Sequence, residues 1–247
     1  MLIIRENSYE DISKQAAEII AQKIKKKTNL VLGLATGSTP LGLYNELIRM
    51  HKNEGLDFSK ITTFNLDEYI GLPENHHQSY HYFMYENFFK HVNINPKAIN
   101  IPDGMAEKHT IACNQYEDKI RHAGGIDFQI LGIGSNGHIG FNEPGSSLSS
   151  RTRLKPLSKK TIKDNSRFFS SIDEVPTKAI TMGIGTIMGA REILLMASGL
   201  NKSEIIKNCV EGPISAMCPA SILQMHRKVI VLLDKDAASK LTIELES

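Results

Sequence analysis

The sequence predicts an α/β fold of Rossmann-like type, with a mostly parallel sheet, helices on both faces and a lid segment. Short apolar runs of strand length alternate with amphipathic helical stretches almost to the end of the chain. Some runs, such as LVLGLA at 30–35, are continuously apolar, as in strands buried on both faces of a parallel sheet. With 247 residues and 41% hydrophobic residues, we expect a single domain over residues 1–247.

Caps and apolar spacing give the order of the elements. Ser8, with Asp11 three residues later, is typical of a helix start. Pro40 at the first helical position, with Thr39 as its cap, predicts a second helix. Further helices are expected at residues 80–88, 110–122 and 202–209. The predicted strands are residues 30–35, 61–66, 126–133, 193–197 and 229–233.

One segment departs from this alternation. Residues 146–177 are rich in Ser, Lys and Arg and contain few apolar residues at regular spacing. Such a segment is either a surface connection or a mobile lid, since long insertions in compact domains are often functional. We expect a lid over about 146–177.

Composition excludes several classes of function. The formal net charge of +2 argues against a nucleic-acid partner. No apolar run approaches the length of a membrane span, and the N-terminus carries no cleavable signal. Three widely spaced cysteines, Cys113, Cys209 and Cys218, predict neither a disulfide framework nor a zinc site and suit a reducing cytoplasm.

Three unusual segments follow predicted strands, at the edge where open parallel sheets bind ligands. The first is Thr36, Gly37, Ser38 and Thr39, between a strand and a helix start. Its glycine, hydroxyls and free helix amides suit an anion. Because the spacings of a P-loop and of a dinucleotide fingerprint are both missing, a phosphate on a small molecule fits better than a nucleotide. The alternative is a plain tight turn.

The second segment is NLDEY at 65–69. Asp67 and Glu68 point in different directions from the end of a strand, so we expect only one of them to face a pocket. A carboxylate in a partly dry site is a suitable base for a carbon acid. The alternatives are a solvated strand end and an ion pair with a lysine.

The third segment is GSNGHIGFNE at 134–143. It combines closely spaced glycines with Asn136, His138 and Glu143, which is a concentrated acid–base set. A metal site is disfavoured because the helical HExxH arrangement is absent, and a nucleophile because there is no GxSxG motif. His76, His77 and His81 are expected to face solvent. Candidate cations for a phosphate are Arg151, Arg153, Lys155, Arg167 and Lys202.

Four segments then stand out together: ATGSTP at 35–40, FNLDEYIGLP at 64–73, GSNGHIGFNEPGSSLSSRTR at 134–153 and NSRFF at 165–169. The set resembles the glucosamine-6-phosphate deaminases, which belong to the glucosamine/galactosamine-6-phosphate isomerase family. The resemblance implies conversion of glucosamine 6-phosphate and water to fructose 6-phosphate and ammonia, in the cytoplasm. It implies no metal and no organic cofactor.

Site residues follow from the resemblance by position in the motifs. It implies that Asp67 removes the C2 proton, that His138 moves the proton in ring opening and that Glu143 assists it. Asn136 stands where many members have an aspartate that orients the histidine, so we expect activity with an altered pH profile. The phosphate-binding positions are Thr36, Gly37, Ser38, Thr39, Arg167 and Lys202.

Regulation and assembly are less determined. In long, hexameric members the resemblance implies an activator site that uses the positions of Ser146, Ser147, Arg153 and Lys155 together with a C-terminal extension. Because this chain ends soon after Lys240, we expect weak or absent activation by N-acetylglucosamine 6-phosphate. A monomer and a homo-oligomer both remain open.

Two other functions share the expected fold. A 6-phosphogluconolactonase needs a phosphate site and a histidine but no base at C2, and Asp67 within FNLDEY argues against it. A sugar-phosphate sensor predicts a fused DNA-binding domain and a decayed acid–base set, and neither expectation fits this chain.

Overall fold

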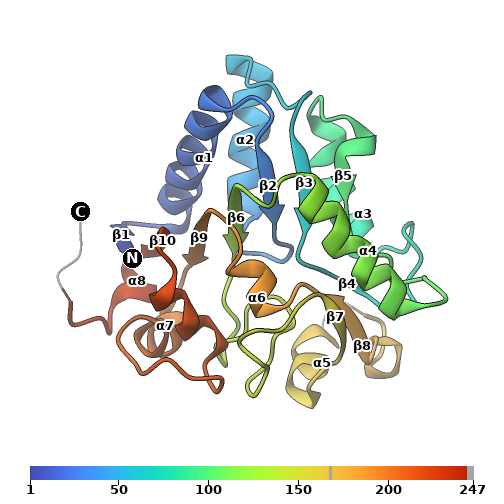
Figure 1. The fold of residues 1–247 in the computed structure, drawn as a ribbon. Coiled ribbons are helices and arrows are strands. Elements are labelled where there is room, and N and C mark those ends of the chain that lie inside the picture. The colour runs from blue at the N-terminus through green and yellow to red at the C-terminus, as the bar shows by residue number, and fades with distance from the viewer. Residues whose placement is uncertain (167–168, 244–247) are drawn as a thin grey trace.

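The computed structural model describes residues 1–166 and 169–243 and confirms the α/β fold (Figure 1). A seven-stranded parallel sheet has the order β1-β10-β9-β6-β2-β3-β5. Its strands are β1 Leu2–Glu6, β2 Val31–Leu34, β3 Thr62–Asn65, β5 Ile99–Asn100, β6 Phe128–Leu131, β9 Glu192–Ala197 and β10 Val229–Asp234. The five predicted strands are all present, whereas β1 and β5 were not predicted.

Helices cover both faces of this sheet, as the alternation of apolar runs predicted. One face is covered by α1 Tyr9–Lys26, α2 Leu41–Glu54 and α3 Tyr80–Asn87. The other face is covered by α4 His109–His122, α6 Ile184–Ile187, α7 Ser203–Val210 and α8 Lys235–Ala238. Short 3-10 turns occupy Phe89–His91, Pro96–Ala98, Ile172–Glu174, Leu200–Lys202 and Pro219–Met225.

A second, three-stranded antiparallel sheet was not predicted. Its order is β4-β8-β7, from β4 Asp67–Tyr69, β8 Lys178–Thr181 and β7 Arg153–Pro156. Leu66 joins the two sheets, because its N–H donates to Leu34 O (3.1 Å) in the large sheet while its carbonyl accepts from Met182 N (2.7 Å). The small sheet therefore lies beyond the carboxyl end of β3, below the large sheet in Figure 1.

The segment 146–177 is more regular than a surface connection. It supplies β7 and the helix α5, Lys159–Asn165, and it buries Leu157 and Val175. Strand pairing of β7 with β8 therefore orders part of the segment. That it moves as a lid stays a prediction.

One predicted cap is wrong. Ser8 caps α1 as expected, with its hydroxyl accepting from Asp11 N. Thr39, however, does not cap α2, because Pro40 occupies the cap position and has no side-chain group that could bond the first turn. Tyr9 fills this role from α1 by accepting from Gly42 N (2.8 Å).

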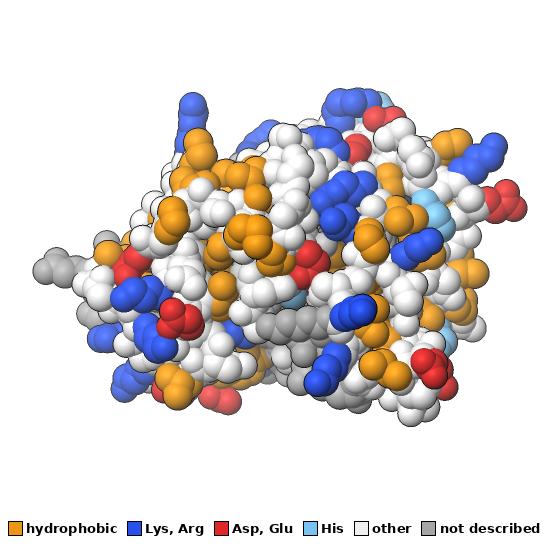
Figure 2. Space-filling model, turned by 90° about the horizontal axis from the view of Figure 1, so that it is seen from below, with side chains coloured by type: hydrophobic (Ala, Val, Ile, Leu, Met, Phe, Trp, Pro, Cys, Tyr) orange, Lys and Arg blue, Asp and Glu red, His pale blue; other side chains and the backbone are white. Residues whose placement is uncertain are grey.

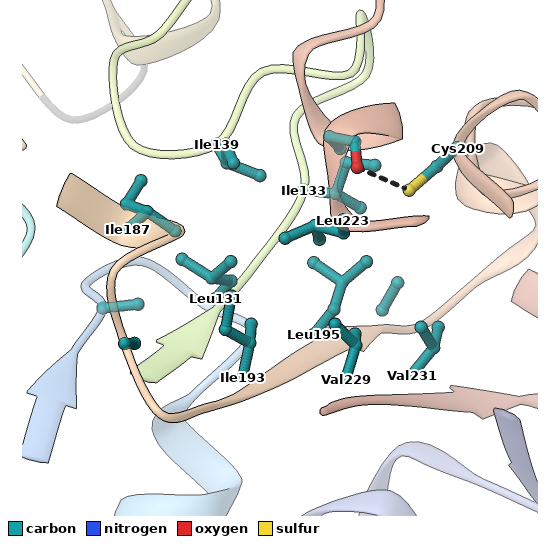
Figure 3. Packing of buried hydrophobic residues seen from close by; sticks show 14 of the residues in the cluster. Leu131, Ile133, Ile139, Ile187, Ile193, Leu195, Cys209, Leu223, Val229 and Val231 are labelled. Atoms are coloured by element: carbon teal, nitrogen blue, oxygen red, sulfur yellow. Dashed lines mark hydrogen bonds between the residues drawn. The ribbon is translucent and has the colours of Figure 1, made fainter. Parts of the chain in front are cut away.

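The loop after β6 is anchored in the apolar core. Figure 3 shows Ile133 and Ile139 among side chains from β6, β9 and β10, with Cys209 donating to a backbone carbonyl nearby. Both isoleucines are almost fully buried. The polar residues between them are thus held at both ends by burial of apolar surface.

In the described part of the chain, no helix has the length and apolar character needed to cross a membrane.

Substitution of Gly104 tests how closely this residue approaches the backbone of β4. A Cβ at this position would lie 1.9 Å from Tyr69 O, so Gly104→Ala forces the backbone of β4 to shift. We expect a loss of about 1–3 kcal/mol of unfolding free energy, measured by urea denaturation. Met105→Ala, at the exposed neighbour, is the control and should change stability by less than about 0.5 kcal/mol. Equal urea midpoints for Gly104→Ala and the unchanged chain would contradict the close approach.

Candidate active site

A cleft of about 790 Å³ lies at the carboxyl ends of β2, β3 and β6. Its walls include residues from all three predicted segments, among them Thr36, Asp67 and His138. Figure 2 shows the molecule from the side of the small sheet, where Lys and Arg side chains are scattered among acidic ones. The convergence expected of open parallel sheets is therefore present. The described residues of this face form no continuous basic stripe.

Asp67 is the buried carboxyl group of the cleft. It begins β4, where its backbone pairs with Thr181, and its side chain is only 6% exposed. Among the described residues, no donor forms a hydrogen bond to its carboxyl oxygens. Burial, followed by the negative charge of Glu68, raises the pKa of Asp67 to about 8. A carboxyl group in this state is poised to exchange a proton near neutral pH.

Glu68 points away from the cleft, as alternation along a strand requires. Its carboxylate accepts from Tyr80 N (2.9 Å) and His81 N (3.0 Å) at the start of α3, and from Tyr69 N (2.8 Å). His81 Nδ1 lies 2.8 Å from the same carboxylate, so the expectation that His81 faces solvent is wrong. His76 and His77 are exposed, as expected. Glu68 thus ties α3 to β4 and leaves Asp67 to the cleft.

His138, Asn136 and Glu143 form one hydrogen-bonded chain. Because a carboxylate only accepts, the Asn136 amide must donate through Nδ2 to Glu143 Oε2 (2.7 Å). Its oxygen then accepts from His138 Nδ1, at 2.6 Å. Nδ1 therefore carries a proton, which places the lone pair of the neutral imidazole on Nε2. His138 lines the cleft, whereas Asn136 and Glu143 lie behind it.

Gly134 allows this histidine to pack. A Cβ at residue 134 would lie 2.1 Å from His138 Cε1 and 2.3 Å from both ring nitrogens, which is closer than real atoms approach. The backbone closes the turn, with Gly134 N donating to His138 O (2.9 Å). Glycine at residue 134 is therefore a requirement of this close approach.

The pKa of Glu143 is shifted in the opposite direction to that of Asp67. Burial opposes its ionisation, but hydrogen bonds from Thr161 and Asn136, the charge of His138 and a hydrogen bond from Ser158 outweigh it. The pKa of Glu143 consequently lies below its usual value. Glu143 is thus an ionised partner for the histidine at neutral pH.

The other end of the cleft is built for an anion. In the described chain, the backbone N–H groups of Gly37, Ser38 and Thr39 have no acceptor. Tyr9 donates its hydroxyl to Ser38 O (2.9 Å) and so braces this turn. Lys202 Nζ donates to Ile133 O (2.7 Å) at the edge of the same cleft. Amide donors and an ammonium group are suited to a phosphate.

The remaining candidate cations fall elsewhere. Arg151 pairs with Glu117, and Arg153 donates to Asn142 Oδ1 (2.9 Å), so neither lines the cleft. Lys155 is also absent from the cleft walls. Arg167 lies outside the described residues. Lys202 and the 36–39 turn are therefore the candidate phosphate-binding residues that the structure brings together.

An aromatic wall was missed by sequence reasoning. Tyr69, Tyr80, Phe141 and Phe169 line the cleft and contact one another, with Tyr80 stacked on Phe141 at 6.1 Å between ring centroids. These residues come from four separate segments, and only Tyr80 lay in a predicted amphipathic stretch. The wall lowers the local polarity beside Asp67, which strengthens electrostatic interactions there.

Among the described residues, no group of three or more His, Cys, Asp and Glu side chains is arranged to hold a metal ion.

The pKa of Asp67 can be measured directly by carboxyl ¹³C NMR, with its resonance assigned from the Asp67→Asn variant. We expect a titration midpoint near 8. Glu68→Gln should lower this midpoint, because it removes the neighbouring negative charge. A midpoint near the usual carboxyl value of about 4 would show that burial does not control this group.

Comparison with known proteins gives the family. Residues 5–232 match the family described as glucosamine-6-phosphate isomerases/6-phosphogluconolactonase. A glucosamine-6-phosphate deaminase of Clostridium botulinum (strain Loch Maree / Type A3) is 56% identical over 244 residues, covering 99% of this chain and 100% of the relative. A solved structure of a monomeric glucosamine-6-phosphate deaminase is 48% identical with a TM-score of 0.95, covering 98% of this chain and 100% of that one.

A solved 6-phosphogluconolactonase from Trypanosoma cruzi has a TM-score of 0.76 at 21% identity, over 98% of this chain and 97% of that one. This likeness shows a shared fold alone. The chain belongs to the family of glucosamine-6-phosphate isomerases and 6-phosphogluconolactonases.

Proposed function

We propose that this protein is a glucosamine-6-phosphate deaminase, which converts glucosamine 6-phosphate and water to fructose 6-phosphate and ammonia. The 56% identical relative, which is aligned over its whole length, is named a glucosamine-6-phosphate deaminase. The observation that carries the proposal is Asp67, a buried carboxyl group with a raised pKa in the same cleft as His138 and an anion-binding turn. An aldose phosphate needs these three parts.

Ring opening comes first in this proposal. His138, with its lone pair on Nε2, takes the proton of the C1 hydroxyl and delivers it to the ring oxygen, so that the C1–O5 bond breaks. The carboxylate of Glu143 stabilises the transient imidazolium charge, with Oε2 lying 3.7 Å from His138 Nδ1. Asn136 holds this oxygen in place by a hydrogen bond. The open-chain aldehyde is the species on which the carbon chemistry acts.

Asp67 then acts at C2. Its carboxylate removes the C2 proton, and the electron pair moves to form the C1–C2 double bond. The aldehyde oxygen gains a proton as the neighbouring ammonium group loses one, which gives a neutral enolamine. Reprotonation at C1 produces the ketose imine, to which water adds at C2 before ammonia leaves. The substrate's ammonium group, next to C2, favours the ionised form of Asp67 when the substrate binds.

Asn136 distinguishes this chain from members with an aspartate there. An amide can accept from His138 and donate to Glu143 at once, whereas a carboxylate at the same place would repel Glu143. Asn136 therefore supports an ionised Glu143. We propose that asparagine at this position changes the pH dependence of the activity and does not abolish the activity.

A lactonase is the second candidate, since the family includes both activities. Hydrolysis of a lactone requires no base at a sugar carbon, so it leaves Asp67 without a role. The lactonase neighbour is only 21% identical, compared with 48% for the deaminase. The deaminase assignment accounts for more of the site.

We also propose that the whole of residues 1–247 acts as one monomeric unit. The 48% identical solved relative is described as monomeric, which supports this state. The thiols of Cys113, Cys209 and Cys218 are unpaired, which suits the cytoplasm as the place of the reaction.

The proposed function is tested by adding glucosamine 6-phosphate and following ammonia and fructose 6-phosphate. Asp67→Asn should lower kcat by about 10²–10⁴-fold, since it removes a general base, while substrate still binds. Asp118→Asn, an exposed carboxylate on α4, is the control and should keep the full rate. Near wild-type turnover by Asp67→Asn would show that the base is another group.

Activation by N-acetylglucosamine 6-phosphate should be weak or absent. Arg153, one of the positions that the resemblance implies for an activator, already donates to Asn142 Oδ1 and to Arg151 O. We expect hyperbolic rate curves that the activator leaves unchanged. A sigmoidal curve that becomes hyperbolic with N-acetylglucosamine 6-phosphate would overturn this expectation.

A further inference from the structure

Glu143 is held from the segment that we expect to act as a lid. The hydroxyl of Thr161, in the first turn of α5, donates to Glu143 Oε1. The other oxygen, Oε2, accepts from Asn136 within the 134–143 loop. Thr161 is only 5% exposed, whereas Lys159 and Lys163 on the same helix are exposed. The two carboxylate oxygens of Glu143 thus accept hydrogen bonds from two separate segments, the 134–143 loop and α5.

Ser158 contacts both Thr161 and Glu143 from the start of α5. Ser158 Oγ caps α5 by accepting from Thr161 N (3.1 Å), and it lies 3.0 Å from Thr161 Oγ1. Because a carboxylate only accepts, the hydroxyl proton of Thr161 is directed to Glu143 Oε1. The single hydroxyl proton of Ser158 is shared between Thr161 Oγ1 and Glu143 Oε1, which lies 3.2 Å from Ser158 Oγ. The result is a hydrogen-bonded chain from the cap of α5 to the carboxylate.

This chain continues to the histidine. Glu143 accepts from Asn136, and Asn136 accepts from His138 Nδ1. Among the described residues, His138 is the titratable group that faces Glu143, with Nδ1 3.7 Å from Oε2. The hydrogen bond from Thr161 follows burial among the causes that set the pKa of Glu143, and it lowers that pKa.

Docking of α5 does not depend on the Thr161 hydroxyl alone. Leu157, Ile162 and Phe169 pack in an apolar cluster with Tyr69 and Phe141. This cluster places the helix against the small sheet by apolar burial. Removal of the Thr161 hydroxyl by an isosteric valine should therefore leave α5 in place and affect mainly Glu143.

We propose that Thr161 is a positioning residue for Glu143, so that the ring-opening group is correctly oriented only when α5 is docked on the 134–143 loop. The inference rests on the proposed function for its kinetic consequence. The contact itself is independent of that function. In this account, α5 both covers the cleft and completes the acid–base set, which limits ring opening to the covered state.

The kinetic test compares Thr161→Val with Thr161→Ser. Thr161→Val should lower kcat by about ten- to a hundredfold with KM unchanged, because a hydrogen bond to a charged group is lost while the cleft keeps its shape. Thr161→Ser restores the hydroxyl and should rescue the rate to within about threefold. Thr177→Val, the same change at an exposed position of the segment, is the matched control.

A purely structural role would give another pattern. Thr161→Val at the wild-type rate, an equal loss in Thr161→Ser, or a rise in KM with unchanged kcat would each overturn the proposal. The last pattern would mean that the hydroxyl only helps α5 to cover the substrate.

Hydrogen exchange of the α5 amides tests the contact without catalysis. Thr161→Val and Glu143→Gln should each speed exchange modestly, and the double variant should exchange no faster than the faster single variant. Additive effects would show that the two side chains do not interact. If the unchanged protein releases no ammonia, the proposed function and the kinetic role both fail. A non-additive exchange cycle would then still establish the contact.

Discussion

The site depends on one backbone junction at Leu66. Its N–H bonds the large parallel sheet and its carbonyl bonds the small antiparallel sheet, so the chain changes sheets within one residue. Asp67 follows immediately and is carried into the seam between the sheets, where burial raises its pKa. Because β4 pairs with β8, which also pairs with β7, the same junction brings α5 over the cleft. The passage of the chain from one sheet to the other at Leu66 therefore positions both Asp67 and the helix α5 that covers the cleft.

The two buried carboxyl groups show how similar exposure yields opposite chemistry. Asp67 and Glu143 are 6% and 7% exposed. Asp67 lacks hydrogen-bond donors among the described residues and stands beside Glu68, so its neutral form is favoured. Glu143 receives hydrogen bonds from both the loop and α5 and faces His138, so its ionised form is favoured. Because their pKa values are shifted in opposite directions, Asp67 is suited to exchange a proton with carbon, whereas Glu143 is suited to stabilise a positive charge.

Sequence reasoning recovered the elements that have strong local signals. Five strands of the large sheet were predictable from their apolar runs. The convergence of residues 36–39, 65–69 and 134–143 was predictable because parallel strands present their carboxyl ends at one edge. The small sheet was not, since its strands, DEY, RLKP and KAIT, contain no apolar run like those of the predicted strands, and pairing orders them. The contacts of His81 and Thr161 were also missed. Both depend on which residues a distant segment brings near, which spacing along the chain does not encode.

The central claim is that Asp67 acts at the carbon that bears the amine, while the phosphate lies on the 36–39 turn. A crystal structure with 2-amino-2-deoxyglucitol 6-phosphate, an open-chain analogue of the substrate, tests this layout most directly. The account predicts the phosphate on the N–H groups of Gly37 to Thr39, near Lys202, and C2 within about 3.5 Å of the Asp67 carboxyl group. A complex in which C2 lies away from Asp67, with the phosphate elsewhere in the cleft, would contradict it.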